Sequence, residues 1–230
     1  MGRLFDFGRC HAIDLPGHGR SPPAREASTV GDYAQNLLEA SRLGELEAAV
    51  WVGWSLGAQV ALEVAARLGN RLAGLVLVSG TARFSAAPGY PHGLPSAEVD
   101  ALAARLKQNP RKALGRFFAS WFADGELSEE ERRRQTERLL AKAPDPKASL
   151  GALSALAQFD GRPLLQSILA PVLLIHGGQD AIVPLGASAY LADHLPRARL
   201  EVLPAVGHAP LLSRPDRLCE LFSAFLKEPR

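Results

Sequence analysis

The segment Gly53–Gly57, with the sequence G-W-S-L-G, constrains the fold of this chain more than any other. It follows the apolar run Ala48–Val52 and leads into Leu56–Leu68, a stretch of small and apolar residues. A serine between two glycines, after a strand and before a helix, predicts a sharp turn with a strained backbone at Ser55. Such a turn lifts the hydroxyl clear of the sheet and directs the Leu56 N–H toward a developing oxyanion. The pattern predicts a nucleophilic serine, and glycines that let strand and helix approach closely.

Short apolar runs alternate with helical patterns along most of the chain. The runs expected to form strands are His11–Leu15, Ala48–Val52, Leu72–Val78, Pro171–His176 and Arg199–Leu203. Helices are expected at Thr29–Leu43, Leu56–Leu68 and Arg214–Lys227. Nearly continuous apolar strands that alternate with helices predict an α/β fold, with a mostly parallel sheet covered by helices on both faces.

Strand-like runs are missing between residues 82 and 165, where several helices are expected instead. They include Ser96–Gln108, Pro110–Phe122 and Ser128–Lys142. We therefore predict a helical cap, residues 82–165, inserted between two strands of one sheet. The core of that sheet would comprise residues 1–81 and 166–230.

Composition and charge exclude several classes of protein. With 26 Lys and Arg against 24 Asp and Glu, and 47% hydrophobic residues, the 230-residue chain is neither disordered, collagen-like nor a coiled coil. The net charge of +2 and the lack of a basic stripe with interleaved aromatics disfavour nucleic-acid binding. No apolar run is long enough to span a bilayer, and the amino terminus lacks the apolar region of a signal peptide.

The two cysteines, Cys10 and Cys219, cannot form a disulfide framework. Their small number suits a reducing compartment, so we expect a cytoplasmic protein. No cluster of His, Cys and Asp has the spacing of metal ligands, so we expect neither a metal nor a cofactor.

A serine is a poor nucleophile unless a base activates it and a third group orients that base. After such a turn, the acid and then the histidine follow along the chain. Asp180 follows the strand Pro171–His176, and His208 follows the last strand, which places both on loops at the carboxyl edge of the sheet. We predict Ser55, Asp180 and His208 as the catalytic residues, with His176 supporting the Asp180 loop. The alternatives are a turn or N-cap role for Asp180 and no role for His208.

Three stretches resemble the α/β-hydrolase superfamily, and within it the BioH-type pimeloyl-[acyl-carrier protein] methyl ester esterases of biotin synthesis. They are Ala12–Ser21 (AIDLPGHGRS), Trp51–Gly57 (WVGWSLG) and Ala205–Pro215 (AVGHAPLLSRP). The first is shared by much of the superfamily. The second is more selective because Trp54 precedes the serine, and Cys219 in the last helix also resembles that family.

The resemblance implies a serine carboxylesterase that hydrolyses a methyl ester of an acyl chain held on acyl-carrier protein. Ser55 would attack the ester carbonyl while His208 takes its proton and Asp180 holds the imidazole. The Leu56 N–H would stabilise the oxyanion, methanol would leave, and water would hydrolyse the acyl-enzyme.

Aromatic residues are the candidates for contact with the acyl chain. The cap residues Phe117, Phe118 and Trp121 form either the cap's own core or the wall of an acyl-chain tunnel. Trp54 either lines the pocket beside the nucleophile or packs beneath the turn.

The resemblance also implies that basic residues of the cap receive the acidic carrier protein. Residues 105–147 carry 11 Lys and Arg against seven Asp and Glu, a net charge of +4. Arg132, Arg133, Arg134 and Arg138 lie on successive turns of one predicted helix, which would attract an acidic partner. The alternative is a solvated helix face with pairs such as Glu129–Arg133.

One motif of the family is not found: a His-Gly pair on a loop after an early strand, which supplies the second oxyanion N–H. We therefore expect the N-terminal strands to be missing, and we interpret Met1–Phe7 as the tail of the first helix. Without the strand between His11–Leu15 and Ala48–Val52, two buried edges would lack backbone partners. The sequence would then start at an internal methionine, or the chain would be truncated and would repack or pair with another chain.

Two alternatives to the carrier-protein esterase remain. The same three catalytic residues would serve a general short-chain esterase, a lactonase or a C–C hydrolase. A non-catalytic hydrolase fold that acts as a binding module is the other, favoured by the missing oxyanion loop. A full-length chain would be a monomer.

Overall fold

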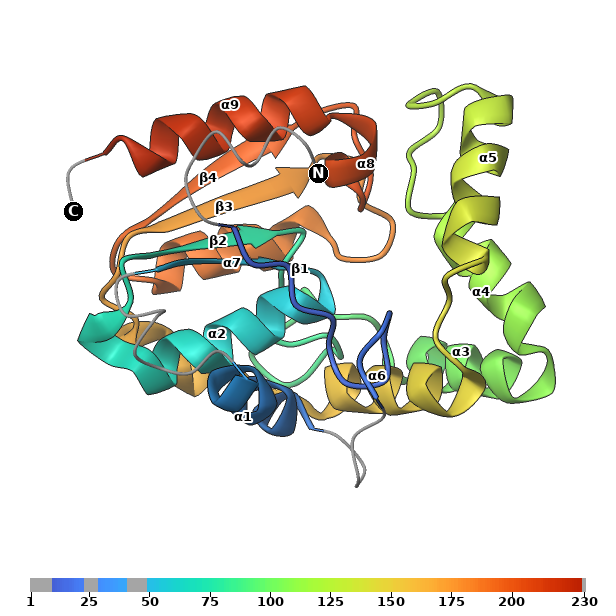
Figure 1. The fold of residues 1–230 in the computed structure, drawn as a ribbon, viewed down its shortest axis with the longest axis horizontal. Coiled ribbons are helices and arrows are strands. Elements are labelled where there is room, and N and C mark those ends of the chain that lie inside the picture. Colours follow the sequence, from blue (N-terminus) through green and yellow to red (C-terminus); the bar gives the residue numbers. More distant parts are fainter. Residues whose placement is uncertain (1–9, 23–28, 41–48, 229–230) are drawn as a thin grey trace.

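A computed structural model describes residues 10–22, 29–40 and 49–228 of the chain (Figure 1). Within these ranges four strands form one parallel sheet in the order β1-β2-β3-β4. They are β1 (Val50–Trp54), β2 (Gly74–Val78), β3 (Val172–Gly177) and β4 (Ala198–Leu203). Four expected strands and the parallel α/β sheet are thereby confirmed. The expectations for Met1–Phe7, Ala48 and residues 41–43 lie outside the described residues.

Helices cover both faces of the sheet because successive residues of a strand point in opposite directions. On one face, Leu75 of β2 belongs to an apolar cluster with α1 (Val30–Ala40) and α2 (Leu56–Leu68). On the other face, Val76 clusters with α9 (Pro215–Leu226). Figure 1 shows these two layers on either side of the strands. The part of the chain outside the cap also contains the 3-10 helix η2 (Gly69–Arg71) and the helices α7 (Leu185–His194) and α8 (Pro210–Ser213).

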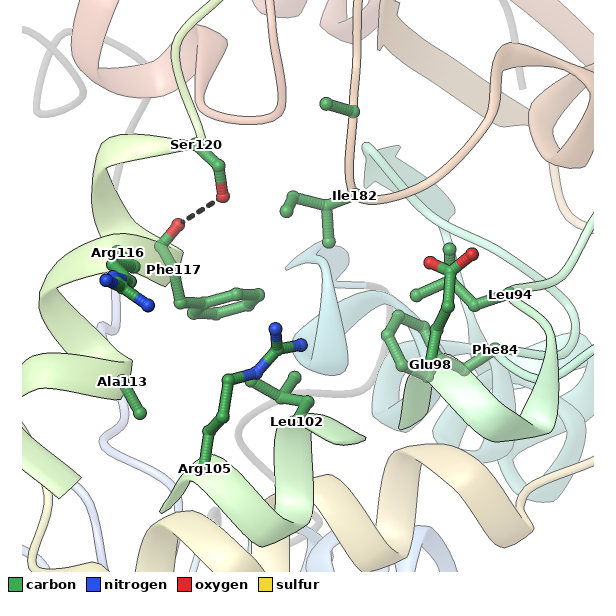
Figure 2. Close-up of a pocket in the computed structure, with 11 residues that line it drawn as sticks. Phe84, Leu94, Glu98, Leu102, Arg105, Ala113, Arg116, Phe117, Ser120 and Ile182 are labelled. Carbon is green, nitrogen blue, oxygen red and sulfur yellow. Dashed lines mark hydrogen bonds between the residues drawn. The ribbon is translucent and has the colours of Figure 1, made fainter. Parts of the chain in front are cut away.

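The segment between β2 and β3 is helical, as predicted. It holds α3 (Ser96–Gln108), α4 (Pro110–Ala119), α5 (Glu129–Leu140), α6 (Pro146–Gln158) and the 3-10 helix η3 (Arg162–Ser167). We call this segment the cap; its limits at residues 82 and 165 stay a prediction. A cavity opens between α3, α4 and the loop after β3 (Figure 2). None of the helices in the described ranges combines the length and apolar character needed to cross a bilayer.

Side chains at the helix ends explain where the cap helices begin. The Asn109 side chain accepts a hydrogen bond from the Lys112 N–H at 3.0 Å, which starts α4. A capping box between Ser128 and Glu131 starts α5. These local signals explain why both helices begin within one residue of the predicted start, whereas α4 ends at Ala119 and α5 at Leu140, both earlier than predicted.

The prediction of a strand at His11–Leu15 is wrong. These residues run as irregular chain, and 42% of Ile13 is exposed. A strand needs an adjacent backbone to pair with, and the described part of the chain places none beside the outer edge of β1. Accordingly Val52 of β1 is 56% exposed. The turn that follows is present, since the His18 N–H donates to the Leu15 carbonyl at 2.8 Å.

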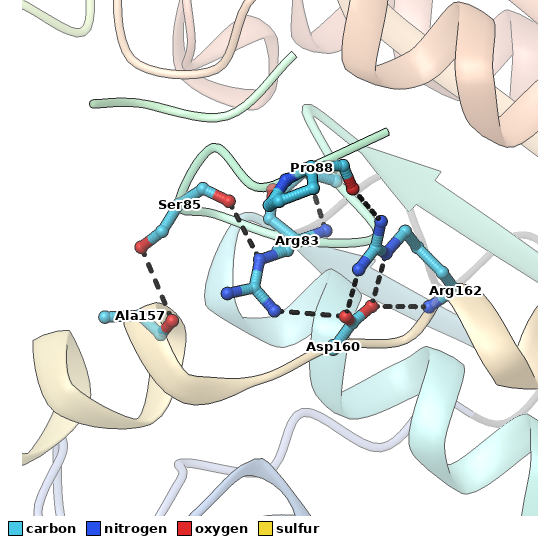
Figure 3. A network of polar contacts seen from close by, with 7 residues as sticks. Arg83, Ser85, Pro88, Ala157, Asp160 and Arg162 are labelled. Atoms are coloured by element: carbon cyan, nitrogen blue, oxygen red, sulfur yellow. Dashed lines mark hydrogen bonds and ion pairs between the residues drawn. The ribbon is translucent and has the colours of Figure 1, made fainter. Parts of the chain in front are cut away.

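An ion-pair cluster ties the two ends of the cap together (Figure 3). Asp160 accepts from Arg162 Nη2 at 2.6 Å and from Arg83 Nη1 at 3.0 Å, which joins the start and the end of the cap. Beside it, the Gly161 N–H donates to the Ala82 carbonyl at 2.8 Å. Hydrogen bonds from Arg162 lower the pKa of Asp160 to about 2.

We predict that Asp160→Asn destabilises the folded chain at pH 7 by about 1–2 kcal/mol. The pKa of Asp160 is lower in the folded chain than the value of about 4 in an unfolded chain. The stabilisation is therefore present above pH 4 and lost as the pH falls toward 2. Urea unfolding of wild type and variant at pH 7 and pH 3 should show the difference shrinking. Asp100→Asn, on the exposed side of α3, is the control.

Candidate active site

The turn between β1 and α2 has the strained backbone that the sequence predicts. Ser55 has φ 54° and ψ −117°, and it is one of two described non-glycine residues with positive φ. A Cβ on Gly53 would lie 2.2 Å from the Gly57 carbonyl oxygen, so only glycine permits this approach of strand and helix. For Gly57 the prediction that a glycine is needed is wrong. A Cβ at this position would meet no described atom within 4 Å, so the close approach of strand and helix does not require glycine there. Gly57 contributes to the close approach through its backbone.

The structure brings Ser55, His208 and Asp180 together in one hydrogen-bonded chain. His208 Nε2 lies 2.8 Å from Ser55 Oγ, and His208 Nδ1 lies 2.7 Å from Asp180 Oδ2. The side chains of His208 and Asp180 are fully buried, whereas Ser55 is half-buried. A hydroxyl, an imidazole and a carboxylate in this order can transfer the serine proton to the imidazole and stabilise the resulting charge.

Asp180 serves the loop and the imidazole with different oxygens. Its Oδ1 accepts the Ile182 and Val183 N–H groups at 2.8 and 2.9 Å, while Oδ2 faces His208. The alternative of a turn residue is therefore confirmed, and it is compatible with the predicted catalytic role because a different oxygen faces His208. Burial alone raises the pKa of Asp180, but the charge and hydrogen bond of His208 outweigh it and hold the pKa below its ordinary value. The carboxylate is thus charged at neutral pH.

His176 packs behind Asp180, as the sequence led us to expect. Its Nδ1 lies 2.6 Å from Ser188 Oγ, and its Nε2 lies 2.9 Å from the Val183 carbonyl and 3.3 Å from Asp180 Oδ2. Nε2 faces two acceptors, which favours the neutral tautomer with its proton there, and the Ser188 hydroxyl, which also lies 3.3 Å from the Gly80 carbonyl, can then donate to Nδ1. Burial lowers the pKa of His176, so the ring is neutral at pH 7. It supports the Asp180 loop without adding a charge.

We predict that His176→Gln flattens the loss of stability on mild acidification. As the pH falls below about 6.5, the unfolded chain binds a proton at His176 that the folded chain does not bind. This difference lowers the unfolding free energy of wild type by about 1 kcal/mol between pH 7 and pH 5.5. The variant lacks the imidazole and should not show this decrease. Urea unfolding at the two pH values measures it. His11→Gln, on an exposed segment, should leave the slope as in wild type.

The Leu56 N–H is well placed for an oxyanion. Leu56 is the first residue of α2, and N–H groups of a first helical turn have no acceptor within the helix. The positive end of the helix dipole lies at the same position. Leu56 therefore remains the predicted backbone donor to the oxyanion.

Trp54 and Trp121 pack beside His208, and Phe118 packs against Trp121. The rings of Trp54 and Trp121 meet edge to face, with centroids 4.8 Å apart, and Phe118 contacts Trp121 at the same distance. Trp54 also donates from Nε1 to the His208 carbonyl at 2.9 Å. These contacts favour the packing alternative for all three residues, and their contact with substrate stays a prediction.

Phe117 lines the cavity between α3, α4 and the loop after β3, which has a volume of about 250 Å³ (Figure 2). Its other apolar walls include Phe84, Leu102 and Ile182, the last of which follows Asp180 by two residues. Arg105 and Arg116 line the same cavity, and neither forms an ion pair with any described residue. The sequence suggested a basic cap, but nothing in its pattern singled out these two arginines.

The four arginines of α5 differ in their surroundings. Arg132 is turned inward: its Nη2 donates to the Ala123 carbonyl at 2.7 Å and lies 3.6 Å from Asp124. Arg133 is exposed and pairs with Glu137 at 3.7 Å. Arg134 and Arg138 are exposed as well. The arginines of α5 available to a partner are therefore Arg133, Arg134 and Arg138, which share the helix surface with the exposed glutamates Glu129, Glu130, Glu131 and Glu137.

The sequence matches the profile of the Alpha/beta hydrolase family over residues 2–221. The chain belongs to the α/β-hydrolase family. Relatives include the pimeloyl-[acyl-carrier protein] methyl ester esterases of Nitrosomonas europaea and Chromobacterium violaceum. The first is 35% identical, with 94% of this chain and 84% of the relative aligned. The second is 38% identical, with 88% and 78% aligned. The resemblance drawn from the motifs is confirmed.

Solved structures give the same fold. An esterase from Exiguobacterium antarcticum superposes with a TM-score of 0.86 at 25% identity, covering 94% of this chain and 81% of that one. An enol-lactonase from Burkholderia xenovorans superposes with a TM-score of 0.78 at 22% identity, covering 94% and 79%. At the lower identity the likeness shows the α/β-hydrolase fold alone.

Proposed function

We propose that this α/β-hydrolase is a serine carboxylesterase that removes the methyl group from an acyl chain held on acyl-carrier protein, in the pimeloyl step of biotin synthesis. The observation that carries the catalytic part is the continuous chain from Ser55 Oγ through His208 to Asp180 Oδ2. The predicted enzyme class, a carboxylic ester hydrolase, is confirmed by the relatives.

The reaction follows from the positions of the three side chains. His208 Nε2 accepts the proton of Ser55 as Oγ attacks the ester carbonyl, and Asp180 stabilises the imidazolium. The Leu56 N–H donates to the oxyanion. His208 then gives the proton to the departing methoxide, and methanol leaves an acyl-Ser55. A water that gives its proton to His208 hydrolyses that ester and restores the serine.

Two features of the cap support the proposal of a carrier-bound substrate. The cavity has apolar walls for an acyl chain, and it reaches the Asp180 loop through Ile182. Exposed arginines of α5 lie in the same cap, where they would attract an acidic protein. The names of the relatives support the same substrate for this chain.

The hydrogen-bonded chain also bears on the alternatives. A binding module has no use for a fully buried Asp–His pair aimed at a strained serine, so this geometry favours catalysis. A general esterase or lactonase would use the same three residues, and the exposed arginines of α5 are the feature that favours a carrier protein.

We predict that Ser55→Ala lowers hydrolysis of a p-nitrophenyl ester by on the order of 10³-fold or more, since it removes the nucleophile. Circular dichroism and the melting temperature should match wild type. Ser154→Ala, on the exposed side of α6, should retain full activity. Retained turnover in Ser55→Ala would contradict the nucleophile assignment.

We predict that reversing Arg133, Arg134 and Arg138 to Glu lowers kcat/KM for a carrier-bound methyl ester about 10-fold or more at low salt. Hydrolysis of a free methyl ester should stay within about twofold, because the catalytic residues are untouched. Arg132 is left in place since it holds the Ala123 carbonyl.

The matched control reverses three exposed arginines of the core, Arg71, Arg197 and Arg217. It changes the net charge equally and should affect both substrates alike. Equal losses from the two triple variants would reject α5 as the docking face.

A further inference from the structure

The turn between α4 and α5 lies directly against the loop that carries His208. The His208 N–H donates to the Trp121 carbonyl at 2.7 Å. One residue earlier, the Gly207 N–H donates to Glu126 Oε2 at 2.8 Å, and the same oxygen accepts the Ala123 N–H at 2.6 Å. One carboxylate oxygen therefore joins the cap to the loop of the catalytic base.

The two segments are packed so closely that a side chain on Gly207 has no room. A Cβ there would lie 2.4 Å from the Trp121 carbonyl oxygen and 2.8 Å from the Ala123 nitrogen. Glu126 is 7% exposed, so its hydrogen bonds from two N–H donors are largely shielded from bulk solvent. The junction is a buried contact that a small displacement of either segment would break.

Burial of the Glu126 side chain lowers the stability of the fold, which favours a role beyond packing. Its second oxygen, Oε1, is buried without a hydrogen-bond partner in the described part of the chain. Leaving a carboxylate oxygen desolvated lowers stability. Local costs of this kind concentrate at functional sites, where geometry matters more than stability.

The opposite side of His208 is held as well. Trp54 donates to the His208 carbonyl at 2.9 Å, and Asp180 holds the imidazole at 2.7 Å. The ring must reach Ser55 Oγ with Nε2 while it keeps this second contact. Proton transfer over such a chain loses efficiency when the base moves by a fraction of an ångström.

We propose that Glu126 is a positioning residue for the catalytic base, which it aligns by fixing the Gly207–His208 backbone to the cap. The inference rests on the proposed function, because it assigns Glu126 a role in the proton transfer by His208. The contact continues outward through Ala123. The Ala123 N–H donates to Glu126, and the Ala123 carbonyl accepts from Arg132 of α5. Glu126 thus couples the position of the cap to the position of the base.

The test compares Glu126→Ala with Glu126→Gln in hydrolysis of a free p-nitrophenyl ester. Glutamine keeps an acceptor oxygen for both N–H groups, so kcat should stay within about threefold of wild type. Alanine removes the acceptor, and kcat should fall about 10- to 100-fold while KM changes less than about threefold. Glu130→Ala, exposed on α5, is the control. If Glu126→Ala does not fold, Glu126→Asp takes its place, because its shorter side chain cannot reach both donors.

A second readout does not depend on turnover. The proton between His208 Nδ1 and Asp180 gives a downfield ¹H NMR signal when the imidazole is held in place. We expect this signal in wild type and Glu126→Gln, and its broadening or loss in Glu126→Ala. Unchanged kcat and signal in folded Glu126→Ala, or equal defects in both variants, would overturn the inference. Wild type without esterase activity would refute the proposed function instead, and the NMR comparison would still decide the role of Glu126.

Discussion

The site depends on the contact between the backbone of Gly53 and the first turn of α2. At this contact the chain leaves β1, turns through Ser55 at φ 54° and enters the helix without an intervening loop. A sparsely populated backbone conformation with positive φ at a non-glycine residue costs on the order of 1–3 kcal/mol. The cost is offset by the burial of α2, whose apolar residues are almost completely enclosed between the sheet and α1. The surrounding core holds this strained turn, and with it the half-buried Ser55, in place.

The parallel register of the sheet then places the other two groups. Trp54 pairs with Val78, Val78 with Ile175, and Gly177 with Leu203, so the carboxyl ends of all four strands reach one edge within a few residues. Loops that leave this edge carry Asp180 and His208. Three side chains separated by up to 153 positions therefore meet within hydrogen-bond distance. A packed cap and the Glu126 contact fix the last of these loops from the outside.

Much of the fold could be predicted because its signals are local. The apolar runs, the small residues of α2 and the polar caps of α4 and α5 each act over a few neighbouring residues. One wrong prediction, a strand at His11–Leu15, shows the limit of such signals. A strand pattern describes a segment that could pair, whereas pairing requires an adjacent backbone edge. The exposed Ile13 and Val52 show that the described chain does not provide that partner.

The sequence by itself determined the family, the parallel sheet, the strained serine and the order of the three candidate catalytic residues, because each is encoded by short spacing or by chain order. Only the tertiary structure decided what each cap residue contacts. It turned Arg132 inward and left Arg134 and Arg138 exposed, although all three share one charge pattern. It also brought Glu126 to Gly207, a contact across 81 positions. Such contacts depend on how distant segments pack, and no local pattern of residue types specifies that.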